Sequence, residues 1–132
     1  MILSYSKHDF IEAIIQGEKI HTIRTDVKKR WKAGMSIQHW RGNPRNVHSK
    51  VKPYQFHEGV CDGVQEVRIE CMNRSSFGIQ YKVWIGLKIL SGTETHLLAV
   101  RDGLTVKEFS EWFLKDQDVF IGRIIHFTPL RY

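Results

Sequence analysis

The sequence has little that would cross-link the chain or anchor it in a membrane. Cysteine is scarce: Cys61 and Cys71 are the only two, at a spacing that makes no zinc motif, and we expect both to be packed thiols. No apolar run approaches the roughly 18–20 residues of a membrane-spanning helix. The first seven residues also lack the basic start and apolar stretch of a signal peptide. The sequence therefore predicts a soluble, cytoplasmic protein with no membrane partner.

Several common catalytic and cofactor patterns are also missing. The seven histidines include no H-E-x-x-H pair, and His57 and Cys61 have no second pair with zinc-ligand spacing. There is no G-x-S-x-G elbow for a serine nucleophile. There is also no glycine-rich Walker or dinucleotide-binding pattern. We therefore expect no metal and no cofactor.

Acidic residues are almost absent from one part of the chain. Between Lys19 and Lys52 the only acidic residue is Asp26, whereas ten lysines and arginines lie in the same segment. The whole chain carries a formal net charge of +6. Because a basic face gains affinity for polyanions by counterion release, this favours RNA or a nucleotide as partner. The alternative is a solvated surface on a basic protein.

The length and the apolar pattern predict one mixed domain over residues 1–132. Apolar residues at helical spacing predict a helix at 9–16 and another beginning after Thr105, which forms a capping box with Glu108. Six strands are predicted, at 2–5, 20–24, 35–40, 64–72, 81–90 and 119–127. Because there is no βαβ rhythm, we expect an α+β domain: a small, mostly antiparallel barrel of five or six strands flanked by helices.

The segment 41–59 has no clear periodicity and contains glycine and proline, so we predict a long basic loop near the functional cleft. Nucleobases can stack on its aromatic residues while its cations hold phosphates. The candidate ligand-binding residues in and beside this loop are Trp40, Arg41, Arg45, Lys50 and Tyr54. The alternative is a solvated loop that its aromatic residues anchor.

The most informative segment is Gly17-Glu18-Lys19-Ile20-His21-Thr22-Ile23-Arg24. Gly17 stands where a helix C-terminal cap belongs, and the strand that follows places Thr22 and Arg24 on one face. Lys19 lies in the bend and can swing toward them. Together these side chains can bind an anionic or carbonyl-bearing ligand. The alternative is an ordinary strand with polar residues on its exposed face.

A second candidate is the Asp102-Gly103 pair before Thr105. We expect the Asp102 carboxylate to lie at the positive end of the following helix, where it can accept a proton or pair with Lys19 or Arg24. The alternative is an Asp-Gly turn with no further role.

The segment 17–24 resembles the G-x-K-x-x-T-I-R signature of ASCH domains in the PUA-like superfamily. Trp31-Lys32-Ala33-Gly34-Met35 resembles the family's entry into its next strand. Asp102-Gly103-Leu104, with Phe109 and Trp112-Phe113 downstream, resembles its D-G-F…F…W-F helix. The resemblance spans most of the chain and implies a β-barrel with a cleft lined by the signature.

The resemblance also implies a function. Members of the superfamily bind RNA, and a small bacterial ASCH branch hydrolyses N4-acetylcytidine with a lysine, a threonine and an acidic residue. By motif, these catalytic roles fall on Lys19, Thr22 and Asp102, the last at a place where that branch has a glutamate.

Three functions therefore compete. The first is an RNA- or nucleotide-binding domain, which we place ahead because an ordinary lysine, with a pKa of about 10.4, is a poor base at pH 7. The second is an amidohydrolase of a modified nucleoside, with Thr22 as nucleophile and Lys19 as base. The third is a protein-interaction domain with an inert cleft. A small closed pocket that joins Lys19, Thr22 and Asp102 would favour catalysis, and an open basic groove would favour a longer nucleic acid.

Overall fold

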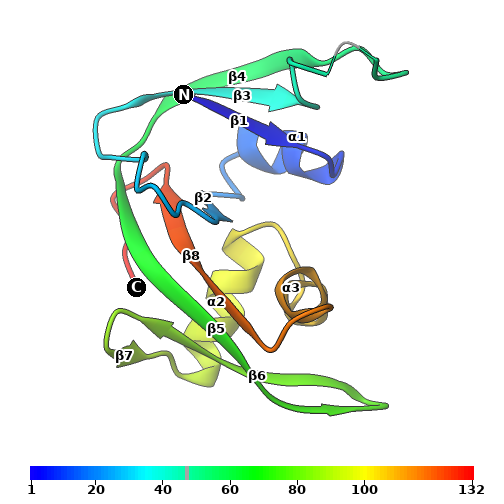
Figure 1. Ribbon diagram of the computed structural model, residues 1–132. Coiled ribbons are helices and arrows are strands. Elements are labelled where there is room, and N and C mark those ends of the chain that lie inside the picture. The colour runs from blue at the N-terminus through cyan, green and yellow to red at the C-terminus, as the bar shows by residue number, and fades with distance from the viewer. Residues whose placement is uncertain (47) are drawn as a thin grey trace.

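A computed structural model describes residues 1–46 and 48–132, and in it the strands pair into two sheets (Figure 1). The smaller sheet has the order β1 (Ile2–Tyr5), β3 (Ser36–Arg41) and β4 (Tyr54–Val60). β1 runs parallel to β3, and β3 runs antiparallel to β4.

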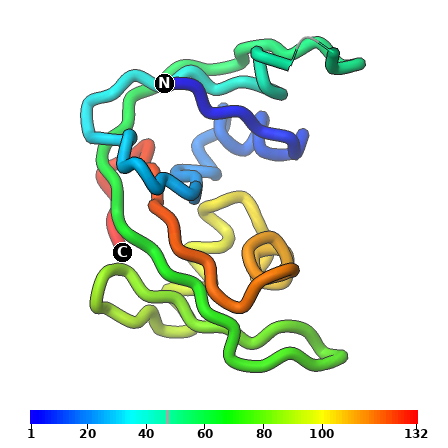
Figure 2. The backbone as a smooth tube through the Cα atoms, in the orientation of Figure 1, coloured from blue at the N-terminus to red at the C-terminus, as the bar shows by residue number. Residues whose placement is uncertain are grey.

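The larger sheet has five strands, and every neighbouring pair is antiparallel. Its order is β2 (His21–Arg24), β8 (Val119–His126), β5 (Gly63–Ser75), β6 (Gly78–Ile85) and β7 (Lys88–Ile89). β5 is long and curves through the molecule in Figure 2, so that its beginning lies beside the end of the chain after β8.

Over residues 1–46 and 48–132 three helices complete the fold: α1 (Asp9–Ile15), α2 (Gly92–Arg101) and α3 (Val106–Leu114). α1 follows β1 directly, and α3 packs on α2 and on the face of β5, β6 and β8. In the described ranges, none of these helices has the length and apolar character required to cross a bilayer. The predicted mixed α+β class is confirmed, as is the capping box of Thr105 and Glu108.

Two predicted segments differ from the structure. The second half of the expected loop 41–59 is β4, which extends the sheet by pairing with β3; position 47 lies outside the described residues. The expected strand 81–90 turns at Gly86, whose φ is +59°, so that β7 folds back on β6. The described strands thus number eight in two sheets, and a closed barrel stays a prediction.

The sequence prediction also missed α2. Ser91 and Glu94 form a complete capping box at its start, and the S-x-x-E pattern that signals it is present in the sequence. Only Leu98 and Ala99 are buried along this helix. Because its apolar stripe is so narrow, helical periodicity alone gives a weak signal there.

Buried histidines make the fold sensitive to acid. Burial lowers the pKa of His39 to about 4 and that of His126 to about 3. Between these values and the ordinary pKa of about 6.5, the unfolded chain binds more protons than the folded chain. The free energy of unfolding should therefore fall as the pH falls below about 6.5, by roughly 1.4 kcal/mol per pH unit for each histidine.

Urea unfolding at intervals between pH 7 and pH 4.5 tests this expectation. The variant His39→Gln should show a shallower slope than the unmodified protein. An unchanged slope would mean that His39 takes up its proton in the folded state as readily as in the unfolded state.

Candidate functional site

A small cavity of about 90 Å³ lies where the two sheets and the helices meet. Its polar wall is formed by Lys19, Thr22, Arg24 and Asp102, and its aromatic wall by Tyr5, Phe10, Trp112 and Phe113. Ligand pockets for drug-sized molecules usually have about 300–1,000 Å³. The cavity therefore has room for one functional group of a ligand rather than for a chain of nucleotides.

The end of α1 brings Lys19 to this cavity. Gly17 adopts a φ of +77°, which favours glycine, and it reverses the chain so that Glu18 and Lys19 donate their backbone N–H groups to the Ala13 carbonyl. The Lys19 side chain is only 2% exposed. Its Nζ lies 4.5 Å from the centre of the Phe10 ring, a cation–π contact. The predicted bend therefore buries Lys19.

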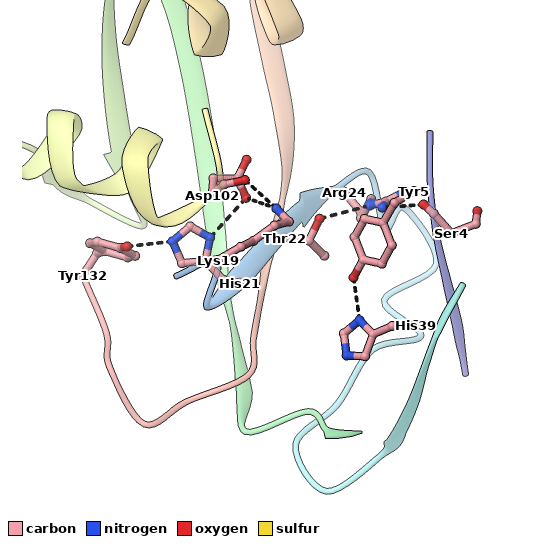
Figure 3. Close-up of polar contacts among 9 residues, drawn as sticks. All are labelled: Ser4, Tyr5, Lys19, His21, Thr22, Arg24, His39, Asp102 and Tyr132. Carbon is pink, nitrogen blue, oxygen red and sulfur yellow. Dashed lines mark hydrogen bonds and ion pairs between the residues drawn. The ribbon is translucent and has the colours of Figure 1, made fainter. Parts of the chain in front are cut away.

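The end of α2 brings Asp102 to the same place. The Ile20 N–H donates to the Arg101 carbonyl and ties the start of β2 to the end of α2. Lys19 Nζ donates to the Asp102 backbone oxygen at 2.6 Å and to its carboxylate Oδ1 at 3.1 Å (Figure 3). The sequence placed Asp102 at the start of the next helix, but it is the C-cap residue of α2. Its pairing with Lys19, which the sequence predicted as one of two partners, is confirmed.

The burial of Lys19 changes its chemistry. Desolvation lowers the pKa of Lys19 below the ordinary value because the charged form loses its water; Asp102 opposes this effect, whereas the neighbouring charges of Arg24 and Lys7 add to it. Among the described residues, Asp102 is the carboxylate that pairs with the ammonium form of Lys19. Because its pKa is lowered, Lys19 becomes neutral at a lower pH than a lysine on the surface does. Lys19 can therefore release and take up a proton more readily than a lysine on the surface.

Thr22 lies on β2, and its hydroxyl is held by Arg24 of the same strand. Arg24 Nε donates to Thr22 Oγ1 at 3.3 Å, and Arg24 Nη2 donates to the Ser4 carbonyl on β1 at 2.8 Å (Figure 3). Thr22 Oγ1 accepts a bond there, so its own proton is free to be donated into the cavity. The guanidinium of Arg24 also lies 5.2 Å from the centre of the Tyr5 ring. β2 therefore presents a hydroxyl and a fixed cation side by side.

The structure does not bring the predicted loop residues to this cavity. Trp40 donates to Gln38, Arg41 donates to the Tyr5 carbonyl, and Tyr54 is half-exposed on β4. Arg45 and Lys50 are exposed, and Arg45 lines a separate hollow. These five residues are therefore not part of the lining of this cavity, and the segment from 54 onward is strand β4 of the smaller sheet.

The sequence did not indicate two residues, His21 and Tyr132, that extend the polar contacts of Lys19 and Asp102. His21 binds Asp102, and Tyr132 binds His21. His21 lies inside the signature segment, but strand alternation places its side chain on the face opposite Thr22. Nothing in the local sequence around Tyr132 indicates its contact with β2, since the two residues are joined only by the fold.

Comparison of the chain with protein-family models, curated proteins and solved structures found no match. The similarity to ASCH domains therefore rests on the motifs alone. Among the described residues, no three His, Cys, Asp or Glu side chains gather as a metal site requires.

Gly103 packs directly against the cavity wall, which gives a test of its shape. Its φ is +87°, and a Cβ there would lie 3.0 Å from the Phe10 ring and 3.3 Å from Lys19 Cδ. Gly17 has a similar φ, but no atom of the described residues lies within 4 Å of a Cβ added there. Both alanine variants should lose about 1–2 kcal/mol from the unfavourable backbone, and Gly103→Ala should lose about 1–3 kcal/mol more from crowding. Equal losses in chemical denaturation would show that the wall has room to spare.

Proposed function

We propose that this chain hydrolyses an amide on a modified nucleobase, of the N4-acylated cytidine kind, with Thr22 as nucleophile and Lys19 as base. The observation that carries the proposal is a fully buried lysine that shares a small cavity with a threonine hydroxyl and is held by the Asp102 carboxylate. The burial supplies the lowered pKa that an ordinary lysine lacks, so the reason for placing simple binding first no longer holds.

The reaction needs only water as a second reactant. The Thr22 oxygen attacks the acyl carbon while its proton passes to the neutral Lys19 amine. The C–N bond then breaks, and the Lys19 ammonium returns the proton to the departing amine. Water hydrolyses the acyl ester on Thr22 and releases a carboxylic acid. Asp102 stabilises the ammonium form of Lys19 while it exists.

The two walls of the cavity suit the two parts of such a substrate. Arg24 lies beside Thr22 and is placed to stabilise negative charge on a carbonyl oxygen. Trp112 is half-exposed and packs edge-on against Phe10, with ring centres 5.7 Å apart. Its free surface offers a face on which a pyrimidine ring can stack. The volume near Lys19 then holds only the acyl group.

A second candidate function is binding of an RNA strand. A hollow of about 510 Å³ adjoins the cavity and shares Ser4 with it; Arg30 and Arg45 lie on its wall. These cations can hold phosphates of a strand whose modified base enters the cavity. The barrel architecture of PUA-like domains belongs to the same proposal, because the motifs that support the function also support that fold.

Turnover of N4-acetylcytidine, as the free nucleoside and within a short RNA, tests the two candidates together. We expect cytidine and acetate as products, with a rate that rises with pH until Lys19 has lost its proton. The double charge reversal Arg30→Glu with Arg45→Glu should weaken binding of the RNA and reduce its salt dependence. It should leave the free nucleoside unaffected. RNA binding without any turnover would support the binding function instead.

A further inference from the structure

From Lys19 and Asp102, a line of hydrogen bonds runs through His21 to Tyr132. The proposed reaction does not use His21 or Tyr132. His21 Nδ1 lies 3.2 Å from Asp102 Oδ1, and His21 Nε2 lies 2.7 Å from the Tyr132 hydroxyl (Figure 3). His21 is completely buried. Its two ring nitrogens thus join the carboxylate to a tyrosine that lies in the segment after β8.

The partners of His21 define its tautomer. A carboxylate can only accept, so Nδ1 carries the proton and donates to Asp102. Burial lowers the pKa of His21, which keeps the ring neutral, and Nε2 then accepts from the Tyr132 O–H. Burial raises the pKa of Tyr132 to about 12, so this hydroxyl keeps its proton. Every hydrogen bond in the line therefore has one donor and one acceptor.

Tyr132 is itself held in place. The side chain of Gln65 on β5 accepts from the Tyr132 N–H at 3.1 Å and donates to the Tyr132 carbonyl at 3.0 Å. The Tyr132 ring also packs edge-on against His21, with centres 5.4 Å apart. Gln65 Oε1 accepts from His126 Nε2 as well. The two hydrogen bonds from Gln65 to the Tyr132 main chain therefore fix the position from which the Tyr132 hydroxyl reaches His21.

From this arrangement we infer that His21 and Tyr132 are positioning residues, which hold Asp102 and thereby set the proton affinity of Lys19. The inference rests on the proposed function of Lys19 as a base. Asp102 Oδ1 accepts from both Lys19 and His21. Donation from His21 offsets part of the carboxylate charge, so Asp102 binds the Lys19 proton less tightly than an unshared carboxylate would.

Several charged and titratable groups surround Lys19 and His21. Asp102, Arg24 and Lys7 act on Lys19, and His39 on β3 lies near it. His21 faces Asp102, Lys19, Arg101, His126 and Tyr132. Replacing His21 leaves Asp102 to Lys19 alone. The amine should then hold its proton more tightly, and its titration should move to higher pH.

The decisive measurement is the titration of Lys19 Nζ by NMR, which needs no substrate. In His21→Phe the acid dissociation constant of Lys19 should fall by about threefold to tenfold relative to the unmodified protein. In Tyr132→Phe, which removes only one oxygen, it should fall in the same direction by less. Tyr81→Phe, which removes a tyrosine hydroxyl bonded to Val106 on α3, is the control and should leave it unchanged. An unchanged Lys19 titration in both His21→Phe and Tyr132→Phe would overturn the inference.

Two further readouts complete the test. Labelled histidine in the unmodified protein should show His21 as the neutral Nδ1–H tautomer at pH 7; the Nε2–H tautomer or an imidazolium would contradict the inference. With N4-acetylcytidine, at a pH below the Lys19 titration, kcat of Tyr132→Phe should fall by the same factor as the acid dissociation constant of Lys19, with KM nearly unchanged. If the unmodified protein shows no turnover, the proposed function fails, but the NMR titration still decides whether His21 and Tyr132 control Lys19.

Discussion

Thr22→Val should lose hydrolysis of N4-acetylcytidine by about three orders of magnitude or more, because valine keeps the shape of the side chain but has no oxygen to attack the carbonyl. The structure adds a cost that the sequence did not indicate. Thr22 is only 4% exposed, and its hydroxyl accepts from Arg24. The loss of that bond should lower the free energy of unfolding by about 1–2 kcal/mol.

Thr22→Ser is the matched control. Serine keeps the hydroxyl at the same place, so this variant should retain a measurable part of the turnover and the bond from Arg24. Substrate binding should survive in both variants. Turnover by Thr22→Val close to that of the unmodified protein would exclude Thr22 as nucleophile and leave Lys19 and Asp102 to activate a water molecule.

The second large effect concerns the buried ion pair. Asp102→Asn should lower the free energy of unfolding at pH 7 by about 3–5 kcal/mol, because it leaves the Lys19 ammonium buried without an opposite charge. Both side chains of the pair are at most 5% exposed, so water cannot replace the carboxylate. Asp118→Asn is the control, since its pair with Arg74 is exposed and should contribute at most about 1 kcal/mol.

The pH dependence gives this prediction a sign. Without Asp102, the folded state favours neutral Lys19 even more strongly than before, whereas the unfolded chain keeps a lysine with a pKa of about 10.4. The unfolded state therefore binds more protons, and the stability of Asp102→Asn should recover as the pH rises from 7 toward 10. Adding Lys19→Met should recover it at pH 7. A double variant as unstable as Asp102→Asn would show that charge is not the cause.

The sequence predicted the core of the site because three of its members belong to one short motif. Gly17 ends a helix, and the strand that follows carries Thr22 and Arg24 two residues apart, so local geometry brings them together with Lys19. Asp102 was found for a different reason. It belongs to a second recognisable motif, although its true position is the end of a helix that the sequence did not reveal.

The remaining parts of the site depend on contacts between distant segments. His21 was not predicted as a site residue because alternation does not show that the end of α2 passes beside β2 and brings Asp102 to it. Tyr132 reaches His21 only after β8 has paired with both β2 and β5. The loop cations are not cavity residues for a related reason, since the pairing of β3 with β4 makes 54–60 a strand of the smaller sheet.

The most direct test of the central claim is to quench the unmodified protein during incubation with N4-acetylcytidine and locate any acetyl group by mass spectrometry of its peptides. The account predicts free cytidine in solution and an acetyl ester on Thr22, which Thr22→Val lacks. If neither cytidine release nor the Thr22 ester is found at every pH tested between 7 and 9, the account is contradicted.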